Sequence, residues 1–386
     1  STLTGKAFNT DAIKRYIRGP RGTVAKLQVL RGKQLLTFSI TRASIPVSSV
    51  EASYMIDLKT GYIRLDKFTE KSYEEFMEAM EALKKQGLQR LILDLRGNGG
   101  GFMNEAVDMA DEFLEGQKIV VYMQGANTKK REYRCKRPGL FETGKLVVLV
   151  DELSASASEV LAGALQDWCR AEIVGRRTFG KGLVQDQFPL SNGAALRLTI
   201  ARYYTPLGRS IQRSYAKGKK VYMDEVWDRF HSGEMFSLDS VRTHQNGKKY
   251  LNNCNDTLYA GDGITPDVFV PVDTSQVRQI VTKVLTTGNL NQTVYLYYLN
   301  NKQKIDQYKS AADFTKRFDA AGMWDGYVKY RGGSMAFEMI KGKEKEQVLQ
   351  SMKAILARYR WRSSGYYEVI NADDPVINKA LETIRK

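Results

Sequence analysis

A mixed α/β protein with a mainly parallel sheet is the fold class that the sequence predicts, on three observations. From Tyr54 onward, strand-like segments alternate with helical ones, as in chains of βαβ units. Leu91–Leu95 is a short continuous apolar run, which is typical of a strand buried on both faces. The composition is that of a globular protein, with 42% apolar and 26% charged residues.

The N-terminal segment predicts a small helix followed by a hairpin. Residues 11–19 carry apolar side chains at helical spacing, and the turn at 19–22 ends the helix. Two alternating strands, 24–30 and 35–40, are joined by Arg31-Gly32-Lys33. One helix and two strands are too little for a stable domain, so residues 1–43 are expected to be part of a larger one.

The central segment supplies the elements of the parallel sheet. Strands are expected at 62–68, 91–95, 119–123 and 146–150. Ser72 and Glu75 have the spacing of a capping box, which predicts a helix from there to Gly87. Further helices are expected at 104–114 and from about Ser156. The chain then looks rich in strands from 182 to 204.

The rest of the chain divides into an irregular part and a helical part. Residues 215–260 are polar and are expected to form a long loop region, and 261–271 form a turn-rich connection. Helical patterns dominate from Ser275, with one interruption at 331–333. The predicted domains are therefore 1–43, a core at 44–273 and a helical domain at 274–386.

The bulk properties exclude some classes of protein and leave others open. No run of about 18 apolar residues exists, so no transmembrane segment is expected. The sequence opens at Ser1 without Met or a leader segment, so we expect that either a leader was removed or the sequence was trimmed. The net charge of +16 suggests nucleic-acid binding, but no zinc-finger, helix-turn-helix or RNA-binding motif accompanies it. An anionic membrane or acidic partner stays open. The three cysteines allow one disulfide without requiring it.

Three short motifs carry candidate chemistry. In 94–101 a strand enters a glycine cluster, where exposed backbone N–H groups can stabilise an anion, although a tight turn explains it equally well. Ser-Ala-Ser-Ala-Ser-Glu at 154–159 places serines between a strand and a helix, where a nucleophile or a simple helix cap fits. Lys181 lies between two glycines, flanked by Phe179 and Leu183. An apolar pocket there would favour the neutral amine, whereas a surface turn would not.

The shortage of histidine favours lysine as the base for such a serine. Only His231 and His244 exist, and both lie in the polar segment 215–260. A Ser-Lys pair needs one lysine whose charge is suppressed, and it is an established variant of the catalytic triad.

Taken in order, these motifs resemble the C-terminal processing (tail-specific) serine peptidase family. The resemblance covers about residues 5–272 and includes Thr-Phe-Gly-Lys-Gly at 178–182, Leu-Arg-Leu-Thr-Ile-Ala-Arg-Tyr-Tyr-Thr-Pro at 196–206 and Gly-Asp-Gly-Ile-Thr-Pro-Asp at 261–267. It implies a crotonase-like mixed α/β protease core. Residues 1–43 resemble the second half of that family's PDZ domain, and the first half, with its carboxylate-binding loop, is missing. Reduced or latent activity would follow.

The resemblance also assigns roles to individual residues. It implies that Ser156 is the nucleophile and that Lys181, 25 residues later, is the general base, with Gln185 orienting the base. Ser154 and Ser158 do not keep this spacing. The oxyanion donors would be the N–H of Ala157 and that of Gly100 or Gly101. Supporting positions fall on Glu159, Asp167 and Thr178. No metal or cofactor is implied.

The expected function is therefore a serine endopeptidase acting on proteins with apolar C-termini, in a bacterial periplasm or envelope. The C-terminal helices are expected to serve self-association or an adaptor. Two alternatives stay open: a PDZ-linked scaffold that binds peptide tails without cutting them, and a basic nucleic-acid-binding protein, which we do not expect.

Overall fold

The computed structural model divides the chain into two compact units, Ser1–Ser48 and Ser49–Lys386, and each is treated by itself. The residues that the structure describes are 10–45, 47–216, 218–237, 247–272, 281, 284–285, 288–330 and 340–386.

The first unit contains the helix and hairpin that the sequence predicts. They are α1 (Thr10–Ile17), β1 (Val24–Arg31) and β2 (Gln34–Thr41), and the two strands pair antiparallel. Among the described residues before Ser49, only Ala25 is buried, while apolar side chains such as Leu30 and Leu35 are exposed. This unit therefore has almost no core of its own, and its assignment to a PDZ domain stays a prediction.

The second unit is built on a six-stranded sheet, which confirms the mixed α/β class. Four neighbouring pairs of strands are parallel, and only β3 and β4 pair antiparallel. β3, β9 and β14 were not predicted from the sequence. The strand predicted at 119–123 as part of this parallel sheet lies instead in a second sheet, where both of its neighbours are antiparallel. In spatial order the strands are β14 (Val268–Phe269), β9 (Glu172–Gly175), β8 (Lys145–Val150), β5 (Arg90–Asp94), β4 (Thr60–Leu65) and β3 (Val50–Met55).

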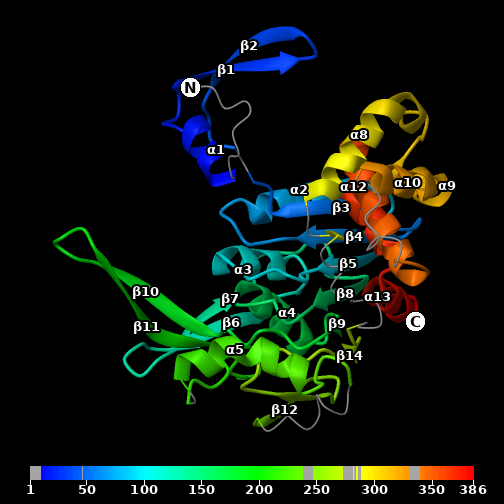
Figure 1. Cartoon of the computed structure of the whole chain (residues 1–386). Coiled ribbons are helices and arrows are strands. Elements are labelled where there is room, and N and C mark those ends of the chain that lie inside the picture. The colour runs from blue at the N-terminus through cyan, green and yellow to red at the C-terminus, as the bar shows by residue number, and fades with distance from the viewer. Residues whose placement is uncertain are drawn as a thin grey trace. The chain divides into compact units, whose positions relative to one another are not determined.

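Helices cover both faces of this sheet, because each central strand buries side chains on both sides. Leu91 and Leu93 of β5 pack with α2 (Ser72–Lys85), α3 (Met103–Asp111) and α4 (Ala157–Asp167). Ile92 points the other way and packs with α13 (Pro375–Arg385). Figure 1 shows these two helical layers. The last helix of the chain thus shares a core with the sheet, and a division at residue 274 stays a prediction.

The predicted capping box at the start of α2 does not form, although the helix begins at Ser72 as expected. The Ser72 hydroxyl accepts a hydrogen bond from the backbone N–H of Thr69 instead. The Glu75 carboxylate accepts from the backbone N–H groups of Ser49 and Val50. The Ser72 hydroxyl also donates to that of Ser49, so both side chains contact the residue that precedes β3.

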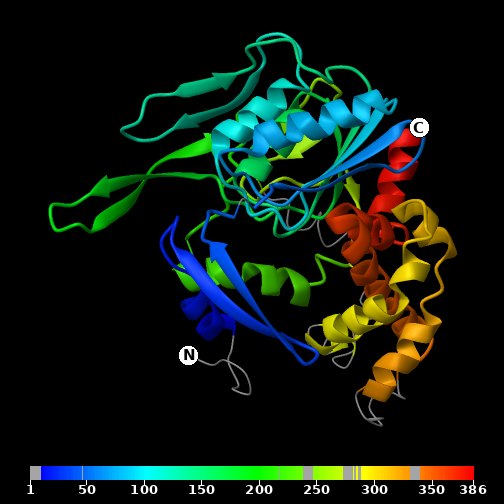
Figure 2. The same cartoon turned by 90° about the horizontal axis from the view of Figure 1, so that it is seen from above.

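A second sheet carries a long hairpin. Its order is β10 (Leu183–Pro189), β11 (Ala195–Tyr204), β6 (Ile119–Gln124) and β7 (Arg131–Arg134). β10 begins two residues after Lys181, and Figure 2 shows its hairpin extending away from the six-stranded sheet.

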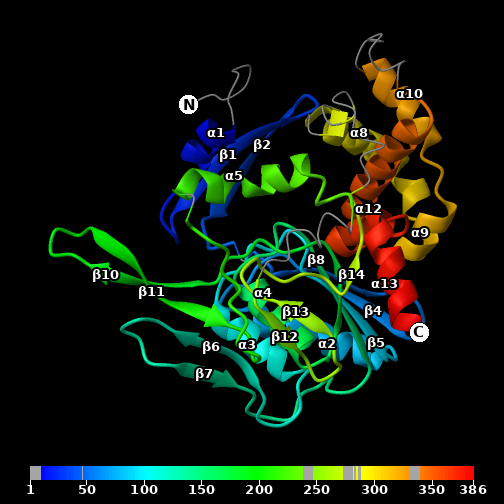
Figure 3. The ribbon, with the colours of Figure 1, turned by 90° about the horizontal axis from the view of Figure 1, so that it is seen from below.

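The expectation of an irregular loop at 215–260 is wrong. This segment contains α5 (Gly218–His231) and an antiparallel pair, β12 (Lys249–Leu251) and β13 (Thr257–Tyr259). Figure 3 shows α5, β12 and β13 in the same unit. Residues 238–246, including His244, lie outside the described residues.

The C-terminal part is helical, as predicted. A separate core containing Val294, Phe314, Tyr327 and Met352 joins its helices. The expected interruption at 331–333 lies outside the described residues. No helix in the described part of the chain has the length and apolar character needed to cross a membrane. The helices are α8 (Gly288–Ile305), α9 (Ala311–Arg317), α10 (Ala321–Tyr330) and α12 (Lys343–Asn371).

A disulfide joins Cys169, just after α4, to Cys254 between β12 and β13, and Cys135 is buried as a free thiol. The bridge spans 85 residues of sequence, a stretch that contains Lys181, the hairpin and α5. On the chain-entropy account, closing so long a loop stabilises the fold by about 4.5 kcal/mol.

Asp94, at the end of β5, is fully buried and ties the sheet to α13. Its carboxylate accepts hydrogen bonds from Tyr62, Arg64 and Arg96, and Arg96 also pairs with Asp374 at the start of α13. Burial acts to raise the pKa of Asp94, but the charges of Arg96 and Arg64 outweigh it and lower this pKa to about 2.

Asp94 is therefore expected to make stability depend on acid pH. Its contribution of about 2 kcal/mol is present above the unfolded-state pKa near 4, and is lost as pH falls towards 2. Asp94→Asn is expected to destabilise the protein strongly at pH 7 and much less at pH 2.5, as measured by urea unfolding. Glu74→Gln, at an exposed site, serves as the control. An Asp94→Asn penalty that does not change with pH would contradict this account.

Candidate functional site

Ser156 lies at the turn between β8 and α4. β8 is almost entirely buried, and the turn that follows brings Ser156 to the N-cap position of α4. Ser156 has φ 58° and ψ −113°, a conformation that residues with side chains rarely adopt. Backbone strain of this kind concentrates at functional sites, because the surrounding structure must hold it in place.

The neighbouring serines are structural. Ser154 donates its hydroxyl hydrogen to the carbonyl of Leu95, and Ser158 donates to the carbonyl of Asn98. Both side chains are fully buried, whereas Ser156 is half-buried. Of the three serines in the motif, Ser156 is therefore the one that a substrate can reach.

The glycine loop 97–101 is tied directly to the serine turn through Asn98. The Asn98 carbonyl also accepts from the backbone N–H of Ala155, and its side chain donates to Leu65 and accepts from the N–H of Gly100. The two motifs that the sequence singled out thus meet in space.

Gly100 must be glycine because the serine turn lies against it. Its φ is +92°, and a Cβ atom there would lie 2.6 Å from the Ala155 carbonyl oxygen and 2.8 Å from the Ser156 Cβ. The Gly100 N–H already donates to Asn98, while Gly101 is exposed. Of the two glycines, Gly101 is the better placed to offer its N–H to a ligand.

A single buried carboxylate joins the turn at 154–158, called the serine turn, to residues 177–182, called the lysine loop. One oxygen of Glu159 accepts hydrogen bonds from the backbone N–H groups of Ser156 and Lys181, each at 2.8 Å. The other accepts from the Gly180 N–H and the Thr178 hydroxyl, each at 2.6 Å. Burial raises the pKa of Glu159, and these four donors partly offset the effect.

Gly263 lies directly against Thr178 and Glu159. The Thr178 hydroxyl accepts from the N–H of Ile264. A Cβ atom on Gly263 would lie 2.7 Å from the Thr178 Oγ1 and 3.0 Å from a Glu159 oxygen. The glycines of the 261–267 motif therefore pack onto Glu159 and Thr178.

The lysine environment differs from the apolar pocket that the sequence suggested. The backbone of Lys181 is fixed by Glu159, and the next residue, Gly182, donates its N–H to Gln212. The Lys181 side chain, however, is exposed. Gln185, on β10 opposite Thr199, is exposed as well. The structure thus holds the lysine backbone in place beside the serine turn while leaving its side chain open to solvent.

Asp167 lies at the other end of α4 from Ser156, about 15 Å along the helix. It is buried and forms an ion pair with Arg209 at 2.6 Å, and it accepts the N–H of Leu207. Asp167 therefore supports the chain that returns from β11, rather than the serine.

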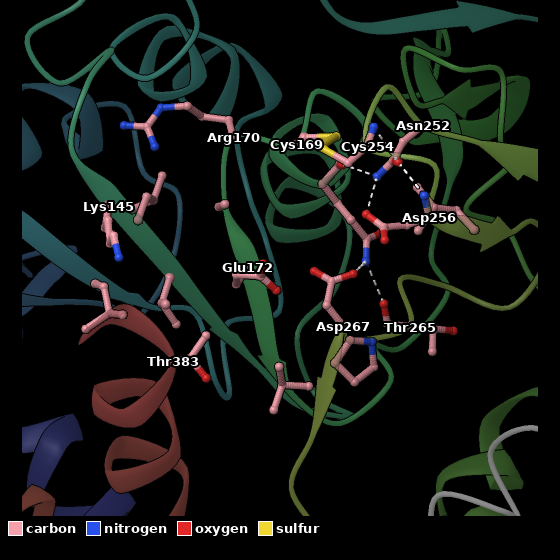
Figure 4. A pocket seen from close by; sticks show the side chains of 18 of the residues that line it. Lys145, Cys169, Arg170, Glu172, Asn252, Cys254, Asp256, Thr265, Asp267 and Thr383 are labelled. Carbon is pink, nitrogen blue, oxygen red and sulfur yellow. Dashed lines mark hydrogen bonds between the residues drawn. A yellow bond between two sulfur atoms is a disulfide. The ribbon is translucent and has the colours of Figure 1, made fainter. Parts of the chain in front are cut away.

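A cavity of about 1390 Å³ also lies at that far end of α4, shown in Figure 4. Ser156, Lys181 and Gln185 are not among its lining residues. Cys169, Cys254 and Asp256 there form the one group in the described residues with the spacing of metal ligands, but the two sulfurs are bonded to each other. The cavity is separate from the serine site.

Sequence reasoning located the serine, the lysine and the glycine loop, but it missed two residues that hold them. Asn98 was visible inside the glycine motif, where an asparagine among glycines can bond to nearby backbone groups. Arg229, which donates to the carbonyls of Arg177 and Thr178, lies in the segment expected to be irregular, where nothing in the pattern indicated a role.

Comparison with known proteins finds a similarity to a peptidase family. Residues 59–219, a segment that includes Ser156 and Lys181, match the family model described as Peptidase family S41.

The similar proteins carry a more particular name. A carboxyl-terminal-processing protease from Synechocystis sp. is 39% identical over 219 residues, covering 54% of this chain and 49% of that protein. The carboxy-terminal processing protease CtpA of Bacillus subtilis is 35% identical over 248 residues, covering 64% and 52%. The chain thus spans about half the length of these relatives. A solved photosystem II D1 C-terminal processing protease is 27% identical, with a TM-score of 0.42, covering 66% of this chain and 57% of that one.

Proposed function

We propose that this protein is a serine endopeptidase of the C-terminal processing type, with Ser156 as nucleophile and Lys181 as general base. The observation that carries the proposal is the Glu159 carboxylate, which holds the backbones of Ser156 and Lys181 on one oxygen atom. A nucleophile and its base need a fixed mutual geometry, and a shared buried anchor provides it.

In this mechanism the neutral amine of Lys181 takes the proton of the Ser156 hydroxyl as the serine oxygen attacks a peptide carbonyl. Lys181 then returns the proton to the leaving amine, which gives an acyl-enzyme and the first product. A water molecule, deprotonated by Lys181, hydrolyses the ester and regenerates the serine. Gln185, four residues later on β10, orients the lysine.

The oxyanion of each tetrahedral intermediate is assigned to the backbone N–H groups of Ala157 and Gly101. Ala157 is the first residue of α4, where N–H groups have no partner within the helix. The Gly100 N–H is less suitable because it donates to Asn98. The partial positive charge at the helix N-terminus adds to the stabilisation.

The exposed position of Lys181 has a consequence for catalysis. A general base must be neutral, and removal of water favours the neutral form of an amine over the charged one. We infer that a bound substrate covers Lys181 and favours the neutral amine. Activity would then depend on substrate binding, in agreement with a latent resting state.

The proposal has three further parts. The protein selects substrates by an apolar C-terminus, its first unit is part of a PDZ domain, and its core has a crotonase-like fold. Support comes from the names of the relatives and from the helix and hairpin before Ser49. The disulfide supports a periplasmic or envelope location, since such bonds persist in oxidising compartments. Contact with an adaptor or a second copy is assigned to the C-terminal helices.

The test is cleavage of an unfolded protein that ends in an apolar tail, beside the same protein with a charged tail, with products identified by mass spectrometry. A fluorophosphonate reagent with an apolar peptide tail, which covers Lys181 as a substrate would, is applied in parallel and its attachment site is mapped. Cleavage of the apolar-tailed protein and labelling of Ser156 are expected.

Other outcomes separate the alternatives. Equal cleavage of both proteins would refute selection by the tail but not the peptidase. Tail binding with neither cleavage nor labelling would favour the scaffold. Salt-sensitive binding of DNA or RNA without hydrolysis would favour the alternative of a nucleic-acid-binding protein.

A further inference from the structure

Helix α5 has its polar and apolar faces reversed relative to an ordinary surface helix. Tyr222 and Arg229 are buried, whereas Met223 and Trp227 are 56% and 67% exposed. Amphipathic helices usually bury the apolar stripe. The buried polar face must therefore be held by specific interactions, and these interactions lead to the lysine loop.

Arg229 donates hydrogen bonds to the backbone of the lysine loop. The same Nη1 atom donates to the carbonyls of Arg177 and Thr178, at 3.1 Å and 2.8 Å. The other side of its guanidinium donates to Glu225, one turn earlier on α5. With 3% of its surface exposed, Arg229 is fixed from both sides. It holds the segment three residues before Lys181.

A second contact from α5 reaches the residue next to Lys181. Arg213 lies between the rings of Phe179 and Tyr222, with its Cζ 4.2 Å and 4.1 Å from their centroids, and it also pairs with Glu225. The carbonyl of Gly180 accepts from the N–H of Arg213 and, at 3.4 Å, from the Tyr222 hydroxyl.

Glu159 and α5 thus hold different backbone groups of the lysine loop. Glu159 accepts the N–H groups of Gly180 and Lys181, while Arg229 donates to the carbonyls that precede them. Without Arg229 these two carbonyls would be left without their charged donor in a buried place, and the loop would shift to find other partners. A displacement of about 1 Å at a catalytic group can lower a rate by about 100-fold.

We propose that Arg229 is a positioning residue for catalysis, which acts by fixing the backbone that carries Lys181. This inference rests on the proposed function of Lys181 and adds to it. It gives α5, which does not contain any of the residues of the catalytic motifs, a role in the reaction.

The experiment compares Arg229→Met and Arg229→Lys with the parent, in the full chain. Peptide hydrolysis gives kcat and KM per folded molecule, and thermal unfolding gives stability. The rate of Ser156 labelling by a fluorophosphonate with a peptide tail, which covers Lys181 as a substrate would, reports on the base. Arg229→Met is expected to lower kcat and the labelling rate together, by about 10- to 100-fold, with KM within about three-fold. Arg229→Lys can still donate to both carbonyls and is expected to recover most of the loss.

Arg170→Met is the matched control. Arg170 also donates to two backbone carbonyls, those of Phe113 and Phe141, but it lies at the far end of α4. This variant is expected to lose stability while keeping kcat per folded molecule.

The proposal would be overturned by an Arg229→Met enzyme with parental kcat, or by an equal loss in Arg170→Met. If Arg229→Met does not fold, Arg229→Gln decides, because its amide can keep one of the two bonds. A kcat loss of about five-fold or more then supports the proposal, and parental kcat refutes it. A parent that neither cleaves nor labels would instead refute the proposed function.

Discussion

Replacing Ser156 with alanine is expected to reduce peptide hydrolysis by about 10⁴-fold or more, while the protein remains folded. The hydroxyl is the only group that forms the acyl-enzyme, and the oxyanion donors alone cannot replace it. Loss of a serine from an N-cap position costs about 1 kcal/mol, which a protein of ordinary stability tolerates. The measurement is cleavage by Ser156→Ala at matched concentration of folded protein, together with loss of fluorophosphonate labelling.

Ser154→Ala is the control that the geometry offers. Its hydroxyl is buried and donates to Leu95, so this variant is expected to lose stability but keep labelling at Ser156. If Ser156→Ala keeps parental cleavage and Ser154→Ala loses it, the nucleophile has been assigned to the wrong residue of the motif.

The parts of the fold that the sequence predicted are those where local pattern and tertiary role agree. The run Leu91–Leu95 is apolar because it is buried on both faces, and β5 lies there with α2 and α13 on either side. The serine turn was found for a similar reason: an apolar strand, a cluster of small residues and a helical pattern follow one another at 146–165.

Helix α5 shows why the rest could not be predicted. A surface helix is usually recognised in a sequence by an apolar face that packs on the core. In α5, however, Tyr222 and Arg229 are buried and Glu225 bonds to Arg229, while Trp227 is exposed. Its segment therefore looked polar and irregular. The exposure of Lys181 could not be predicted either. Its neighbours Phe179 and Leu183 suggested an apolar pocket around the lysine, but Phe179 stacks on Arg213 instead.

Glu159→Gln is expected to be the second most damaging substitution, with a fall in kcat of about 100-fold and a loss of stability of a few kcal/mol. The carboxylate faces four donors, two on each oxygen. An amide in its place must turn its NH₂ group toward one of these pairs, so one pair loses its acceptor whichever way the amide lies. The substitution therefore removes the acceptor either of the Ser156 and Lys181 N–H groups or of the Thr178 hydroxyl and the Gly180 N–H.

Glu112→Gln provides a matched buried control. Glu112 is 2% exposed and accepts hydrogen bonds from the Tyr73 hydroxyl and the Leu140 N–H, remote from both catalytic loops. Both variants are expected to unfold at lower urea concentrations than the parent, but only Glu159→Gln should lose kcat per folded molecule. Equal kcat in the two variants would mean that Glu159 supports the fold alone, and that another contact sets the distance between Ser156 and Lys181.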